Sequence, residues 1–88
     1  MGNTIGAVLI SYDINRLHTD VKDRMKNLGY LENWYYPNQI TYYMPNTTLW
    51  HKSKTSDAAL SDLENVCYQL GVTLDKAVAV LAKEFAGV

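Results

Sequence analysis

The hydrophobic positions of this chain follow patterns that predict both strands and helices. Residues 7–12 form a short apolar run of strand formers, which suits a central strand covered on both sides or meeting a second subunit. From Thr19 a helical period begins, with Thr19 as the expected N-cap and Gly29 as the stop. The apolar face of that helix carries Val21, Met25 and Leu28.

A second helical period follows over residues 57–70, with Ser56 as the expected cap and Gly71 at its end. Its apolar face carries Leu60, Leu63, Cys67 and Leu70. Residues 76–85 fit two patterns. Alternation at Val78 and Val80 predicts a strand, while a stripe from Leu74 to Phe85 and the alanine content fit a helix. We favour the strand, because a sheet of three strands would leave an edge open.

Aromatic residues concentrate in the middle of the chain, between residues 30 and 50. They are Tyr30, Trp34, Tyr35, Tyr36, Tyr42, Tyr43 and Trp50, seven of the ten in the sequence. Tyr and Trp favour pleated surfaces, and the Pro-Asn pairs at 37–38 and 45–46 indicate turns. The segment therefore predicts a hairpin of strands 39–44 and 47–52, preceded by a loop or irregular edge strand over 31–38.

Together these elements give the order β-α-β-β-α-β over a single domain, residues 1–88. That order predicts an α+β protein with the ferredoxin-like fold, a two-layer sandwich in which two helices cover one face of a four-stranded antiparallel sheet. Core positions are expected at Leu9, Leu28 and Leu63.

Composition limits the classes of protein to consider. The 88 residues are 48% hydrophobic and 19% charged, which is typical of a globular chain. A core of this size is small, so we expect a homodimer. No apolar run is long enough for a bilayer, and the first residues lack a basic leader, so we expect a cytoplasmic protein without membrane contact. The single Cys67 is expected to be a buried apolar side chain.

The charge balance argues against strong nucleic-acid binding, because eight Lys and Arg oppose nine Asp and Glu. One basic group, the candidate nucleic-acid contact, comprises Arg16, Lys22, Arg24 and Lys26; the other comprises His51, Lys52 and Lys54. Acidic residues interrupt the first group, as on a solvated helix face. The isolated histidines, His18 and His51, are expected to have surface or capping roles, since two separated histidines do not make a metal site.

One motif suggests chemistry, the stretch Ser11-Tyr12-Asp13-Ile14-Asn15. A carboxylate at the end of an apolar strand, just before a helix, is placed where ligands often bind. Asp also commonly ends strands by capping local backbone N–H groups, and the pattern alone favours that structural role.

The Tyr12-Asp13-Ile14 strand end, followed by a helix ending at Gly29, resembles the small CRISPR-associated adaptation subunits. Similarity to the related SinR-like proteins is closer and adds the aromatic middle and the terminal Phe85-Ala86-Gly87. The resemblance implies a ferredoxin-like fold and candidate catalytic positions at Asp13 and Tyr12. A divalent ion, magnesium or manganese, would be held by two Asp13 carboxylates across a homodimer. The chain departs from the nuclease pattern after Gly29 and in its lack of basic charge.

Three functions stay open at this point. The favoured one is a homodimeric binding module without catalysis and without a required cofactor, contacting a protein or nucleic acid through its aromatic segment. Its candidate partner-binding residues are Trp34, Tyr35, Tyr36, Tyr42, Tyr43 and Trp50. The second is a metal-dependent nuclease using Asp13, and the third is a small toxin-like or phage-encoded effector.

Overall fold

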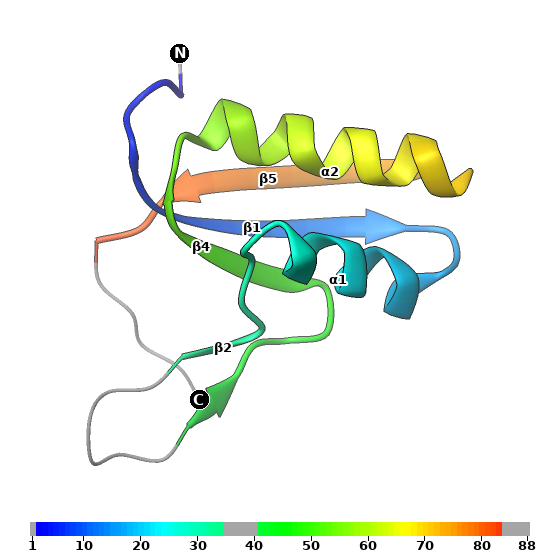
Figure 1. Cartoon of the computed structure of the whole chain (residues 1–88), viewed down its shortest axis with the longest axis horizontal. Coiled ribbons are helices and arrows are strands. Elements are labelled where there is room, and N and C mark those ends of the chain that lie inside the picture. The colour runs from blue at the N-terminus through cyan, green and yellow to red at the C-terminus, as the bar shows by residue number, and fades with distance from the viewer. Residues whose placement is uncertain (1, 35–40, 84–88) are drawn as a thin grey trace.

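The computed structural model describes residues 2–34 and 41–83 of the chain, which fold as an α+β protein (Figure 1). The strands are β1 (Gly6–Ile14), β2 (Asn33–Trp34), β3 (Tyr42–Tyr43), β4 (Thr48–Lys54) and β5 (Leu74–Leu81). The helices are α1 (His18–Asn27) and α2 (Ser56–Leu70). Three strands form an antiparallel sheet in the order β4-β1-β5, and β2 and β3 form a separate two-stranded ribbon.

Strand β1 lies at the centre of the sheet, and its side chains alternate between two different environments. Val8, Ile10, Tyr12 and Ile14 are buried on one face. Both helices cover that face (Figure 1) and contribute Val21, Met25, Ala59, Leu63, Val66 and Cys67 to the core. The period of two in β1 therefore assigns every second residue to the core and leaves the others on the opposite face.

The strand expected over residues 76–85 is confirmed as far as Leu81, because β5 pairs antiparallel with β1 from Leu74 to Leu81. The strand ends there, so Ala82 and Lys83 lie beyond it, and residues 84–85 lie outside the described residues. Cys67 is buried on α2, as predicted. Leu63 is fully buried, whereas Leu28 is 45% exposed and Leu9 lies half-buried on the face away from the helices. Leu28 was expected in the core, but α1 ends before it and the turn into Gly29 directs it outward.

The predicted hairpin of strands 39–44 and 47–52 is wrong for its described part, residues 39–40 lie outside the described residues, and a four-stranded sheet is not confirmed. Residues 42–43 pair with residues 33–34, and β4 pairs with β1. The outer side of β4 is already occupied, because Leu31 and Trp50 exchange both backbone hydrogen bonds, at 2.7 and 3.0 Å. The N–H of Met44 donates instead to the carbonyl of Glu32 at 2.7 Å. A single bridge at Leu31 thus stands where a full fourth strand was expected.

Both predicted N-caps differ from those of the structure. Thr55, not Ser56, caps α2, because its hydroxyl accepts a hydrogen bond from the Ala58 N–H at 3.0 Å. Helix α1 begins after Leu17, which has a left-handed backbone (φ 56°) and makes no side-chain cap. The glycine stop of α2 is confirmed, since Gly71 is left-handed and its N–H bonds the last turn.

The contrast between Leu63 and Leu28 gives a test of the core. Leu63→Ala is expected to lower the free energy of unfolding by about 2–5 kcal/mol, because it opens a cavity among buried side chains. Leu28→Ala is the matched control and is expected to cost less than about 1 kcal/mol, since this side chain is partly in solvent. Urea denaturation measures both; equal losses would contradict the assignment of faces.

Candidate functional site

One face of the three-stranded sheet is not covered by either helix, and we call it the open face. Its residues are the alternate positions of β1 and their cross-strand partners. They comprise Leu9, Ser11 and Asp13 of β1, Thr48 and Trp50 of β4, and Lys76, Val78 and Val80 of β5. Val78 is 55% and Val80 48% exposed, so much of the open face is apolar surface in contact with water. Exposed apolar patches of this kind are typical of interaction sites.

Two tryptophans lie together beside the open face. The rings of Trp34, from β2, and Trp50, from β4, have centroids 4.5 Å apart and planes inclined at 49°. The indole Nε1 of Trp50 donates to the carbonyl of Asn33 at 2.6 Å. This bond ties the β2–β3 ribbon to the sheet and fixes the orientation of the Trp50 ring.

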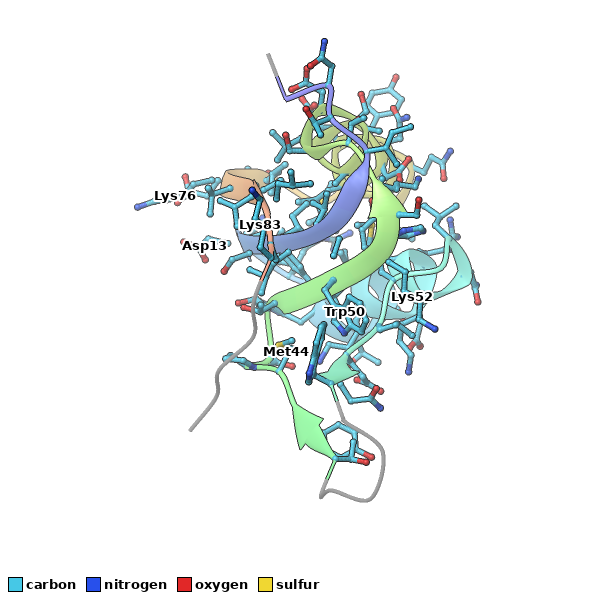
Figure 2. The ribbon with its side chains drawn as sticks, turned by 90° about the vertical axis from the view of Figure 1, so that its left-hand side faces the viewer. Asp13, Met44, Trp50, Lys52, Lys76 and Lys83 are labelled. Carbon is cyan, nitrogen blue, oxygen red and sulfur yellow. The ribbon has the colours of Figure 1, made fainter. Side chains whose placement is uncertain are left out.

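A small cavity, the Trp pocket, opens next to these rings and has a volume of about 110 Å³. It is lined by Ala7, Val8, Leu9, Trp34, Met44, Trp50, Ala82 and Lys83. Figure 2 shows Trp50 and Met44 together below β4, away from α2. Seven of these residues are apolar and only Lys83 is charged. The lining therefore favours an apolar group over a phosphate or a metal ion.

The other predicted aromatic contacts do not all join this pocket. Tyr43 of β3 is 64% exposed and lies outside the lining, while Tyr42 belongs to β3 as the partner of Trp34. Tyr35 and Tyr36 lie outside the described residues. Of the six predicted partner-binding residues, the structure brings Trp34 and Trp50 together in one site.

The two residues of the Tyr-Asp motif lie on opposite faces of the sheet. Asp13 is exposed on the open face, where its partner across the strands is Lys76 (Figure 2). Tyr12 is only 5% exposed and belongs to the core under the helices. The structure does not bring the two groups together, and a catalytic role for either stays a prediction.

Burial raises the pKa of the Tyr12 hydroxyl and keeps it protonated. It has no hydrogen-bond partner among the described residues, and loss of solvent raises its pKa from 10.0 to about 12, with a smaller contribution from Cys67. Burial also raises the pKa of the Cys67 thiol. Both groups are therefore uncharged at neutral pH, as buried side chains of the core commonly are.

The candidate nucleic-acid contacts on and near α1 are largely engaged by neighbouring side chains. Lys26 pairs with Glu32 at 2.8 Å, and this contact lowers the pKa of the Glu32 carboxyl. Lys22 lies 3.8 Å from Glu32 and donates to Asn46 at 3.0 Å. Arg24 donates to Gln69 at 3.4 Å, and Arg16 is exposed at the end of β1. The four cations do not form a continuous basic stripe, because Glu32 neutralises part of it.

Metal ligands are not gathered in the described part of the chain. Across residues 2–34 and 41–83 no group of three His, Cys, Asp or Glu side chains could hold an ion. His18 is exposed, and His51 packs edge-on against Tyr30 with ring centroids 5.0 Å apart. A metal at Asp13 therefore stays a prediction. None of the described helices has the length and apolar content to cross a membrane.

Among the described residues, Tyr30 is the largest fully buried side chain, and it joins three elements. Its hydroxyl donates to Asp62 of α2 at 2.8 Å, and Lys54 of β4 forms an ion pair with the same carboxylate oxygen. The Lys54 ammonium also lies 5.6 Å from the Tyr30 ring centre. Desolvation, and then the bond to Asp62, raise the pKa of Tyr30 well above its ordinary value. This network positions Leu31, the residue that bridges to Trp50.

Comparison with models of protein families, with characterised proteins and with solved structures gives no match to this chain. The site must therefore be interpreted from its own geometry.

Sequence reasoning missed several residues of the Trp pocket, namely Ala7, Val8, Leu9, Met44, Ala82 and Lys83. One signal was present in the sequence, since the alternation in residues 48–52 places Trp50 and Leu49 on opposite faces. The pairing of Trp50 with Leu9 could not be read from that pattern, because it depends on the register between β4 and β1.

Removing the hydroxyl from each buried tyrosine in turn tests whether that hydroxyl stabilises the fold. Tyr30→Phe is expected to lower the free energy of unfolding by about 1–3 kcal/mol, because it removes a bond to a carboxylate. Tyr12→Phe is expected to be neutral or stabilising, since its hydroxyl is buried without a partner in the described part of the chain. Urea denaturation at pH 7 compares them, and an equal loss in both variants would contradict this account.

Alkaline unfolding gives a second test of Tyr12. Its folded-state pKa is raised from 10.0 to about 12, so its contribution to stability is complete below pH 10 and is lost as the pH rises through 12. The free energy of unfolding of the wild type is expected to fall more steeply over this range than that of Tyr12→Phe. Denaturant titrations at several pH values measure the slopes; identical slopes would show that the hydroxyl is solvated.

Proposed function

We propose that this chain is a homodimeric binding module without catalysis of its own, and that it holds a protein partner by an apolar side chain inserted into the Trp pocket. The observation that carries the proposal is the apolar lining of that pocket, on a sheet face that both helices leave uncovered. Aromatic residues and Met are enriched at such contacts. The small core and the exposed valines of β5 support the dimer.

The size and chemistry of the pocket favour a protein side chain over a nucleic acid. An engineered apolar cavity of about 150 Å³ binds benzene, so a pocket of about 110 Å³ suits a group the size of one aliphatic side chain. Nucleic-acid binding draws much of its affinity from Lys and Arg side chains that neutralise phosphate charges. Here Lys22, Lys26 and Lys54 already face carboxylates, and the net charge is −1.

We also infer that the fold is a reduced ferredoxin-like sandwich. Support comes from the strand order β4-β1-β5 and from the Leu31 bridge on the outer side of β4, where a fourth strand would pair. Shortening this strand to one bridge leaves Asn33 and Trp34 available to form the ribbon beside the pocket.

The proposal predicts selective binding of an apolar probe. Backbone amide NMR spectra recorded with capped leucine (N-acetyl-leucine methylamide) are expected to shift at Leu9, Trp50 and Ala82. The substitution Met44→Lys should abolish these shifts, because it puts a charge in the apolar lining. Leu28→Lys is the matched control, with the same charge at an exposed apolar position outside the pocket, and should leave the shifts unchanged.

Two outcomes would replace the proposal. Shifts of the open face with a thymidine oligonucleotide, but none with capped leucine, would indicate nucleic-acid binding. Magnesium- or manganese-dependent cleavage of RNA or DNA by the wild type, lost in Asp13→Asn, would establish the nuclease instead.

A further inference from the structure

Strand β5 directs backbone groups away from the sheet over residues 77–81, clear of the bulge near its start. The N–H of Ala82 donates to the carbonyl of Ala7 at 2.7 Å, which makes these two residues a hydrogen-bonded pair. Because such pairs alternate along an antiparallel ladder, Val80 and Val78 also bond to β1. The intervening residues, Ala77, Ala79 and Leu81, therefore direct their N–H and C=O groups outward. In the described part of the chain no strand pairs with this side of β5.

The two edges of the sheet differ in how they are protected. The outer side of β4 is occupied at Trp50 by the Leu31 bridge. The outer side of β5 has no such cover from the described residues, and residues 77–81 include no charge and no proline. Monomeric proteins usually protect a free sheet edge with charged residues, prolines or bulges, because an unprotected edge can pair with a strand of another chain.

We infer that a second copy of this chain pairs with β5 along its outer edge, antiparallel, with Ala79 of each subunit on the two-fold axis. The inference deepens the proposed function, since it names the interface of the homodimer on which that function partly rests. The two sheets then join into one continuous sheet with β5 and the partner's β5 at its centre.

The register follows from the charges that flank the apolar segment. In a symmetric antiparallel pair centred on Ala79, Val78 lies opposite the partner's Val80. Asp75, at the bulge near the start of β5, and the partner's Lys83, two residues past the end of the strand, then come near each other at each end of the apolar segment. Asp75 and Lys83 are both exposed, and neither forms an ion pair with another described residue. The pairing places two complementary ion pairs at the ends of the interface. Centring on Val78 instead would set Asp75 opposite the partner's Leu81 and leave both charges unpaired.

This register also brings apolar side chains of the two open faces together. Val78 and Val80, about half exposed in one chain, meet their counterparts across the axis. The interface therefore covers apolar surface on the open face and leaves Leu9 and Trp50 accessible to a partner.

Cysteine cross-linking tests the register. Ala79→Cys is expected to form an intermolecular disulfide under mild oxidation, because hydrogen-bonded antiparallel pairs place Cα atoms about 5.5 Å apart, within disulfide range. Val78→Cys, the neighbouring control, is expected to cross-link poorly. Wild-type protein controls for Cys67, which is buried and should not react. A dimer that cross-links through Val78, or through neither position, would overturn this interface while leaving the homodimer intact.

A charge exchange gives an independent measurement that does not depend on new cysteines. Asp75→Lys and Lys83→Asp are each expected to raise the Kd of the dimer about tenfold, since each replaces an attraction with a repulsion. The double variant is expected to return to within about threefold of the wild type. Sedimentation equilibrium measures all four proteins. Additive losses in the double variant would reject the register, and a monomeric wild type would reject both the interface and the homodimer. The capped-leucine titration reports separately on the Trp pocket.

Discussion

The buried phenol of Tyr30 determines where the chain goes after α1. Its ring is enclosed by the core and by His51, and its hydroxyl is fixed by Asp62 of α2. Because the ring is packed in the core and the hydroxyl is hydrogen-bonded, the Tyr30 side chain is fixed in one position. The following residue, Leu31, then meets the outer side of β4, and the ribbon that carries Trp34 continues from there. The location of the Trp pocket thus depends on a hydrogen bond on the opposite face of the sheet.

The alternation of β1 divides the protein into a structural face and an open face. Tyr12 and Asp13 illustrate the division, because adjacent residues of one strand are buried and exposed, respectively. A motif read as a unit in the sequence is therefore split by the pleat of the strand. Chemistry that needed both side chains at one place would require the two to point the same way.

Much of the fold could be predicted from local patterns. Both helices follow from a period of 3.6, the first strand from its apolar run and the strand character of β5 from a period of two. The pairing of the middle segment could not be predicted, because Tyr42 and Tyr43 fit a strand equally well beside β4 or beside β2. The structure has the second arrangement, because Leu31 already pairs with Trp50 on the outer side of β4, and Leu31 follows the fixed side chain of Tyr30. The pocket depends on the same pairing, so only its two tryptophans were found.

The two surfaces assigned to binding use different parts of the same strands. Pairing along β5 employs the outward backbone groups of Ala77, Ala79 and Leu81, while the Trp pocket is built from side chains on the open face. Backbone groups of a strand lie in the plane of the sheet and side chains project from it. A dimer formed along the edge therefore leaves the face free, and joining two sheets holds the two Trp pockets in one fixed relation. An edge that would otherwise promote aggregation becomes the element that sets the spacing between two binding sites.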